Sequence, residues 1–226
     1  MKAILLVSAL TACSTAYADP AAPAKPLRFD EQVRQDFFDG ARGDAPALAR
    51  AIKACDEALT VNPRNAEALV WHGAAVVVQS GQKFRAGDRT AGLALYQTGM
   101  AEMDHAVELA PNDVGVRIPR GAAVLATAQF VPEPEKSRLL KRGVTDYETT
   151  LTVQQAYFAK LTLHAREQLL YGLTDAYATL GETDKARLAY ERMEHDATGS
   201  LLLPSAKARV AGTAVEKTTC NDCHAR

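Results

Sequence analysis

The sequence has none of the short motifs that usually mark an enzyme. It contains no Gly-rich phosphate-binding loop, no Gly-x-Ser-x-Gly turn and no His-Glu-x-x-His zinc motif. It also lacks an excess of charge of either sign, because 26 Lys and Arg residues stand against 27 Asp and Glu residues. A net charge of −1 produces no broad field that would attract nucleic acid or an anionic membrane. We therefore expect no enzymatic activity and no nucleic-acid partner.

Aromatic residues are also scarce, at 6% of the 226 residues, although 47% of the chain is hydrophobic. The apolar residues are mostly Ala, Leu and Val, and they are numerous enough to form a core, which excludes disorder for most of the chain. Small apolar residues combined with strong helix formers favour closely packed helices over sheets. The composition predicts an all-α fold.

The N-terminal segment has the features of an export signal. A basic Lys2 precedes an apolar run over residues 3–12, which is too short to span a bilayer. Ala16-Tyr17-Ala18 then provides small residues at both cleavage recognition positions. We predict a signal peptide over residues 1–18, followed by a Pro/Ala-rich tether over residues 19–27.

A second interpretation of the same segment stays open. Leu10-Thr11-Ala12-Cys13 resembles a bacterial lipobox, in which Cys13 would carry a lipid anchor. In either case the chain leaves the cytoplasm, so we expect a periplasmic or secreted protein, or alternatively an outer-membrane lipoprotein. No later apolar stretch is long enough for a membrane span.

The middle of the chain repeats a pattern of helix end, proline turn and new helix. Gly73 lies ten residues after Pro63, and Gly121 lies ten residues after Pro111. Proline cannot continue a helix, and the Asn or Asp that follows it can cap the next one. A further hairpin is predicted over residues 169–193, where large and small residues alternate around a Gly-Glu turn: Leu173, Tyr177, Gly181, Ala186 and Tyr190.

This pattern resembles the tetratricopeptide repeat (TPR) family, whose helix pairs of about 34 residues stack into a superhelix. The resemblance implies a TPR-like α-solenoid of antiparallel helix hairpins over residues 28–199, with about seven or eight helices. It also implies a scaffold that binds a protein partner on its concave helical face. Pro63 and Pro111 are 48 residues apart, so about 14 residues are inserted within residues 81–99.

Several residues of the helical region have a packing interpretation beside a functional one. Cys55 is expected to be a buried, inert thiol, and Trp71 to be a packing residue. Met100 and Met103 are spaced as core residues on one face of a helix. Together with Asp104 and His105 they also form a possible set of metal ligands.

The charged side chains of this region leave similar alternatives open. Arg117 and Arg120 would either line a groove for an acidic peptide or be surface charges. Glu191 and His195, one helical turn apart, are expected to form a solvated ion pair rather than a metal site. The charged residues of the insertion, from Lys83 to Arg89, are expected to be solvated.

The C-terminal residues provide the one motif with specific chemistry. Cys220, Cys223 and His224 form Cys-x-x-Cys-His, which is the attachment motif of c-type haem. Two thiols at this spacing can form thioethers to both vinyl groups of one haem, and the adjacent imidazole can then bind the iron. Haem c is attached outside the cytoplasm, which agrees with an export signal. We predict covalent haem c on Cys220 and Cys223, with His224 as the iron ligand.

Other uses of these thiols remain open. Cys220 and Cys223 would otherwise form a disulfide or redox pair, or half of a zinc site shared with another chain. A thiol oxidoreductase is disfavoured because no βαβ pattern surrounds the motif. The sixth haem ligand is undecided among six residues, namely His72, His105, His164, His195, Met103 and Met193.

The last segment, residues 200–226, is interpreted as a capping segment that carries the motif. Residues 201–209 predict a short last helix whose leucines pack on the end repeat. As a whole the chain resembles exported bacterial TPR proteins that end in Cys-x-x-Cys-His. The leading hypothesis is a scaffold that transfers electrons to a docked partner, and the alternative is a cofactor-free periplasmic TPR adaptor.

Overall fold

The computed structural model describes residues 28–213, and every regular element in this range is helical. The all-α prediction is therefore confirmed for the described part of the chain. Residues 28–199 contain eight α-helices in four pairs, in agreement with the seven or eight expected there, and one further α-helix follows within the described range. In chain order, with one 3-10 helix, they are α1 (Phe29–Ala41), α2 (Ala45–Val61), α3 (Ala66–Arg85), α4 (Arg89–Leu109), α5 (Val114–Thr127), α6 (Glu135–Gln154), η1 (Gln155–Lys160), α7 (Leu163–Thr179), α8 (Thr183–Asp196) and α9 (Leu203–Val210).

The predicted turn residues set the helix boundaries. After Pro63, the Asn65 side chain caps α3 by accepting a hydrogen bond from the Ala68 amide at 3.2 Å. After Pro111, the Asp113 side chain caps α5 and accepts from the Gly115 amide at 2.8 Å. Each cap satisfies a backbone donor that the first helical turn leaves free. The positions of these two turns are thus correctly predicted.

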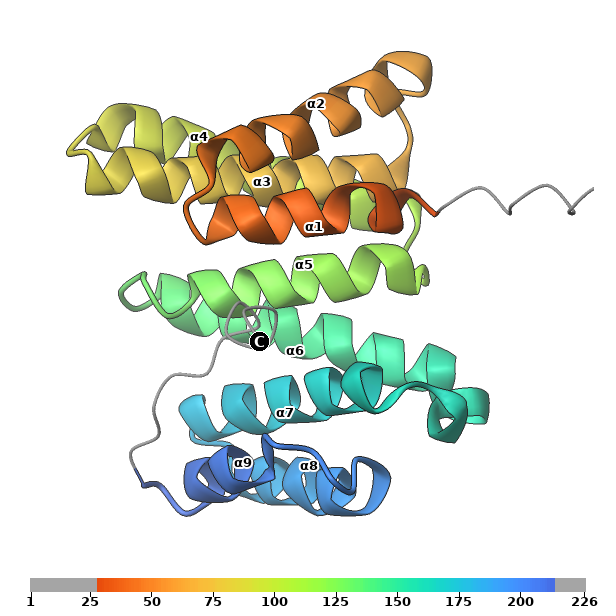
Figure 1. Cartoon of the computed structure of the whole chain (residues 1–226). Coiled ribbons are helices and arrows are strands. Elements are labelled where there is room, and N and C mark those ends of the chain that lie inside the picture. The colour runs from red at the N-terminus through yellow and green to blue at the C-terminus, as the bar shows by residue number, and fades with distance from the viewer. Residues whose placement is uncertain (1–27, 214–226) are drawn as a thin grey trace, which may run out of the picture.

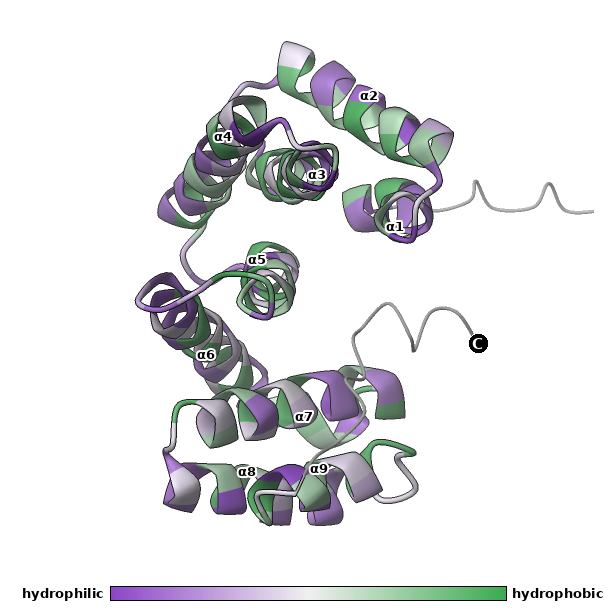
Figure 2. Ribbon diagram, turned by 90° about the vertical axis from the view of Figure 1, so that its left-hand side faces the viewer, coloured by the Kyte–Doolittle hydropathy of each residue, from purple (hydrophilic) through white to green (hydrophobic). Residues whose placement is uncertain are grey.

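Consecutive helices pack as neighbours in two layers. The most extensive contacts join α1 with α2, α3 with α4, α5 with α6 and α7 with α8, and α1, α3, α5 and α7 also contact one another in series. Figure 1 shows these pairs following one another along the molecule. In Figure 2 they form an open arc, with α1, α3, α5 and α7 on its inner side and α2, α4, α6 and α8 on its outer side.

The residues inserted within 81–99 lengthen a helix pair instead of forming a loop. They extend α3 to 20 residues and α4 to 21 residues, joined by a tight turn at residues 86–88. Gly87 adopts φ +83° there, a conformation that glycine takes without a steric penalty. The charged residues around this turn, Lys83, Arg85, Asp88 and Arg89, are exposed, as predicted.

Two of the helix pairs cross at glycines. A Cβ atom at Gly73 of α3 would lie 2.6 Å from the carbonyl oxygen of Gly99 in α4. A Cβ atom at Gly121 of α5 would lie 2.6 Å from the ring of Tyr147 in α6, and one at Gly143 would lie 3.3 Å from the Gly121 carbonyl oxygen. Side chains at these points would force the helices apart, so glycine sets the interhelical distance.

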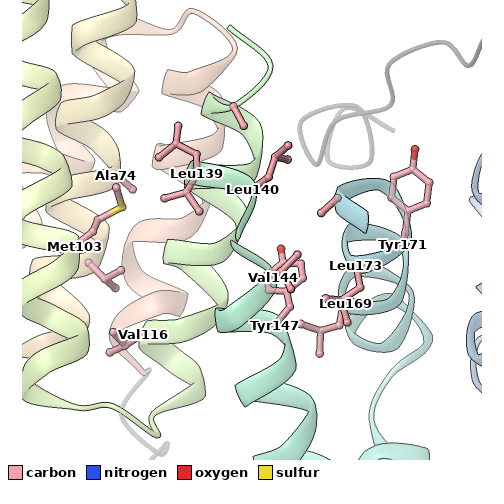
Figure 3. Packing of buried hydrophobic residues seen from close by; sticks show 14 of the residues in the cluster. Ala74, Met103, Val116, Leu139, Leu140, Val144, Tyr147, Leu169, Tyr171 and Leu173 are labelled. Carbon is pink, nitrogen blue, oxygen red and sulfur yellow. The ribbon is translucent and has the colours of Figure 1, made fainter. Parts of the chain in front are cut away.

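The core runs continuously through the stack. Tyr147 is fully buried, and its ring meets both Gly121 of α5 and Gly172 of α7. Figure 3 shows it beside Val144 of α6 and Leu169 of α7. Tyr147 therefore links three consecutive helices through one side chain.

No helix within residues 28–213 is long and apolar enough to cross a membrane.

The described chain ends with α9, which packs on α7 and α8. Arg209 of α9 lies 2.6 Å from the Asp175 carboxylate of α7. The short last helix is present as predicted, and Leu202 and Leu203 are partly buried. Leu201 was expected to pack as well but is 81% exposed.

Candidate functional site

The residues with the most specific predicted chemistry lie outside the part of the chain that the structure describes. These residues are Cys220, Cys223 and His224, together with Cys13 and the signal and tether segments. The candidate site among the described residues is instead a set of three junctions. In each junction one inner helix lies between two outer helices: α3 between α2 and α4, α5 between α4 and α6, and α7 between α6 and α8. We refer to them as the first, second and third junctions.

At the first junction, His72 of α3 bridges the two outer helices. Its Nδ1 lies 2.6 Å from Oε2 of Glu102 in α4, and its Nε2 lies 3.3 Å from Oδ1 of Asp56 in α2. The hydrogen bond to Glu102 raises the pKa of His72, and the charge of Asp56 acts in the same direction. Both ring nitrogens thus face carboxylates, which leaves neither of them directed at an iron ion.

At the second junction, Arg120 of α5 takes the corresponding position. Its Nη2 and Nε donate to the two oxygens of Asp146 in α6 at 2.7 and 2.8 Å, and its Nη1 lies 3.0 Å from Asp104 in α4. Arg117 donates to Asp146 at 2.7 Å. The side chain of Asp146 is completely buried, so its charge depends on these two guanidinium groups.

Both predictions for Arg117 and Arg120 were therefore wrong. The two side chains are only 12% and 10% exposed, and both donate to Asp146. Arg117 also donates to the Pro111 carbonyl oxygen, and Arg120 to Asp104. They form a buried ion-pair network and neither line a peptide groove nor lie free on the surface. The acid that holds them lies 26 or more residues away in sequence, on the next helix.

The neighbouring set of possible metal ligands is separated by the fold. Met100 and Met103 are buried in the core, which confirms their packing interpretation. Asp104 instead points to Arg120 and to Nη1 of Arg142, both at 3.0 Å. The exposed His105 lies beside Glu108 at 3.3 Å. Within residues 28–213, no group of three His, Cys, Asp or Glu side chains is placed to hold a metal ion.

The third junction keeps one acid, Glu148, but has apolar residues at its other two positions, and it contains a pocket of about 730 Å³. Leu170 and Leu173 of α7 line the pocket together with Ala189 of α8. Glu148 of α6 lies at the edge, where its carboxylate accepts a hydrogen bond from the Tyr177 hydroxyl. Burial and this hydrogen bond raise the pKa of Tyr177, so the phenol stays protonated.

Two cations lie along the third junction, and each has a partner. The Lys185 ammonium lies 5.3 Å from the centre of the Tyr177 ring and 2.6 Å from Glu182. Arg192 lies over the ring of Phe158 at 4.9 Å and pairs with Asp196 at 3.1 Å. The pocket therefore combines apolar residues with charges that are already compensated.

The expected pair between Glu191 and His195 on α8 does not form. Glu191 accepts from Arg187 at 2.8 Å, while Nδ1 of His195 lies 2.7 Å from Asp196. All four side chains are at least partly exposed. The residues are solvated as predicted, but their partners are different ones.

The three junctions share one sequence register, which the sequence analysis missed. The acid from the preceding helix lies five residues after a small residue: Asp56 after Ala51, Asp104 after Gly99 and Glu148 after Gly143. The partner in the following helix lies three residues after a small residue: Glu102 after Gly99, Asp146 after Gly143 and Ala189 after Ala186. His72, Arg120 and Leu173 lie between them. This acid–x–acid spacing in α4 and α6 was the available signal.

Cys55 and Trp71 have the packing roles predicted for them. Cys55 is 1% exposed, and burial raises the pKa of its thiol to about 12, so it is protonated and unreactive at neutral pH. Trp71 packs edge-on against Phe37 of α1, with ring centres 5.1 Å apart. This contact joins α1 to α3.

Comparison of the chain with protein-family models, with curated proteins and with solved structures gave no match in any of the three.

Proposed function

We propose that this protein is an exported, TPR-like helical scaffold that binds a protein partner and carries one covalently attached haem c at Cys220 and Cys223. His224 is the proposed iron ligand. In this proposal the scaffold positions the haem against the docked partner, and the haem supplies one-electron exchange.

The scaffold part of the proposal rests on the arrangement of the helices. Pairs of helices follow one another, cross at small residues and leave one series of helices on the inner side of an arc. An open arc presents an extended inner surface, which suits a protein partner better than a small molecule. The inner face is therefore the proposed docking surface.

The haem part of the proposal rests on the donor set, and this is the observation that carries the function. Two thiols and an imidazole in the order Cys-x-x-Cys-His match both the thioether and the ligand requirements of haem c. Cys55 does not compete for the haem vinyl groups, because its thiol is buried and protonated. The proposed signal peptide would deliver the chain to the compartment in which such haem is attached.

The described residues narrow the choice of a sixth ligand. Both nitrogens of His72 face carboxylates, and Met103 and Met193 are buried in the core. His105, His164 and His195 are exposed. We propose that any sixth ligand supplied by this chain is one of these three.

Intact mass tests this function directly. The chain is produced in a bacterial host that expresses the haem c maturation system, and the mature protein is weighed. We expect an increment of one haem that is absent from Cys220→Ala and present in the matched control Cys55→Ala. A loss of two hydrogens without that increment would support the alternative, a cofactor-free periplasmic adaptor with a terminal disulfide. Retained zinc would support a shared metal site.

The same mass measurement decides between the two N-terminal interpretations. A chain that begins at Asp19 supports the plain signal peptide over residues 1–18. A chain that begins at a lipid-modified Cys13 supports the outer-membrane lipoprotein. Neither result affects the haem proposal, because both routes export the chain.

A further inference from the structure

The first two junctions have the same geometry but differ in one chemical property. Arg120 joins Asp104 of the preceding helix to Asp146 of the following helix, and its guanidinium is always charged. His72 joins Asp56 to Glu102 in the same register, but an imidazole loses its charge near neutral pH. The link between α2 and α4 is therefore the one of the two that responds to protons.

A neutral imidazole cannot maintain both contacts of His72. The protonated ring has two N–H donors and can donate to Glu102 and Asp56 at the same time. The neutral ring has one donor, so one of the two carboxylates then faces a nitrogen lone pair. Because the shorter contact is the 2.6 Å one to Glu102, the contact to Asp56 at 3.3 Å is the one that weakens.

Among the charged groups around His72, two carboxylates determine how readily its imidazole holds a proton. Glu102 of α4 and Asp56 of α2 are the charged groups whose fields raise its pKa. Cys55 of α2, next to Asp56, is a neutral thiol, because burial raises its pKa to about 12. The residue next to His72 in the sequence is Trp71, which packs against the apolar Phe37 of α1.

We propose that His72 is a proton-dependent clasp that holds the α1–α2 pair against α3 and α4 when the imidazole is charged and loosens it when the imidazole is neutral. The clasp does not depend on haem or on a docked partner, so this proposal stands apart from the proposed function. Its effect falls on α2, because Asp56 is the contact that is lost. The second and third junctions have no histidine in this position, so they serve as internal references for the pH response of the first junction.

The direction of the pH effect follows from proton linkage. His72 has a higher pKa in the folded chain than in the unfolded chain, where the ordinary value is about 6.5. Its stabilising contribution is then complete below about pH 6.5 and is lost as the pH rises through the folded-state pKa. For opening of α2 alone, which removes only the contact to Asp56, the relevant interval lies between the His72 pKa with α2 packed and with α2 open, and within it the opening equilibrium increases by at most about tenfold per pH unit.

Hydrogen–deuterium exchange of the purified full chain at several pH values between 6 and 9 tests the clasp. After correction for the intrinsic pH dependence of exchange, the amides of α2 are expected to lose protection as the pH rises. The amides of α6 and α8 are expected to keep theirs. Equal loss of protection in all three helices, or no change in α2, would overturn the proposal.

Two variants separate a proton clasp from an ordinary contact. His72→Arg places a permanent charge in the junction, as at Arg120, and is expected to keep α2 protected across the whole pH range. His105→Gln removes an exposed histidine whose contact to Glu108 is 3.3 Å, and it is expected to retain the pH dependence of the parent chain. If α2 responds to pH in His72→Arg as it does in the parent, the proposal is wrong.

A second measurement keeps the proposal testable if His72→Arg does not fold. The His72 ring is titrated by NMR in the parent chain and in Glu102→Gln, which removes the charge with little change in shape. We expect the His72 pKa to lie above the ordinary histidine value in the parent and to fall in Glu102→Gln. An unchanged His72 pKa in that variant would contradict the proposed role of the pair.

Discussion

The second and third junctions join helices in the same order but are filled with opposite chemistry. In the second junction Arg120 and Arg117 surround the buried Asp146, whereas in the third Leu173 and Ala189 occupy the corresponding positions beside a pocket. The backbone framework tolerates both solutions. This difference indicates that the turns and the small residues at the crossings build the stack, while the junction residues are free to acquire other roles.

The second and third junctions also differ in how far their stability depends on a single side chain. A buried ion pair recovers the cost of desolvation only while every partner is present, so the loss of one partner is expensive. An apolar junction has no such dependence, because Leu170 and Leu173 are buried in the core without a charge that needs a partner. The second junction is therefore expected to be more sensitive to single substitutions than the third.

The largest expected effect comes from Asp146→Ala. This substitution removes the buried counter-charge of Arg117 and leaves Arg120 with Asp104 alone, which costs about 3–5 kcal/mol of unfolding free energy. Urea denaturation followed by circular dichroism measures the loss. Glu148→Ala, at the exposed acid of the third junction, is the matched control and is expected to cost far less. Equal losses for the two variants would remove the distinction between the junctions.

A smaller loss is expected where the helices cross. Gly121→Ala places a methyl group 2.6 Å from the Tyr147 ring and is expected to cost about 1–3 kcal/mol through overpacking. Gly81→Ala is the control, because its methyl group meets only the end of the Arg85 side chain at 3.6 Å. It is expected to stabilise the chain by about 0.5–1 kcal/mol through helix propensity. Thermal unfolding of the two variants gives the comparison, and a destabilised Gly81→Ala would contradict it.

The third junction can be converted toward the second. In the third junction, Leu173→Arg together with Ala189→Asp reproduces the ion pair that Arg120 and Asp146 form in the second. Glu148 then takes the place of Asp104. We expect each single substitution to destabilise the chain and the pair to be coupled favourably by about 1 kcal/mol in a double-mutant cycle. Additive effects would mean that the junctions are not equivalent in register.

The smallest effect is expected on the outer surface of α8. Arg187→Ala removes an exposed pair with Glu191, which contributes about 0.3–0.5 kcal/mol. Denaturation at low and at high salt checks this value, since screening should abolish even that contribution. A loss as large as that of Asp146→Ala would show that exposure does not separate the two kinds of ion pair.

The sequence predicts local features of this fold better than its distant contacts. Pro63 with Asn65, Pro111 with Asp113, and the glycine turn at Gly181 depend on backbone chemistry within a few residues, and these turns are found where expected. The burial of Cys55 follows from its spacing on a helical face in the same way.

The residues of the candidate junctions were harder to predict for a physical reason. A helical period shows that Arg117 and Arg120 share a face, but it does not show that Asp146 lies opposite them after a turn and another helix. The pocket at Leu173 is a space between three helices, and no single segment encodes it. Cys220, Cys223 and His224 lie outside the described residues, so their role remains a prediction from the motif.

The visible absorption spectrum of the matured protein tests the central proposal most directly. The chain is purified from a host with the haem c maturation system, after denaturing conditions have removed any haem that is not covalently bound. We predict a Soret band that persists in the parent chain and is lost when Cys220 and Cys223 are both replaced by Ala. A colourless parent protein, produced beside a haem-loaded cytochrome in the same host, would contradict the account.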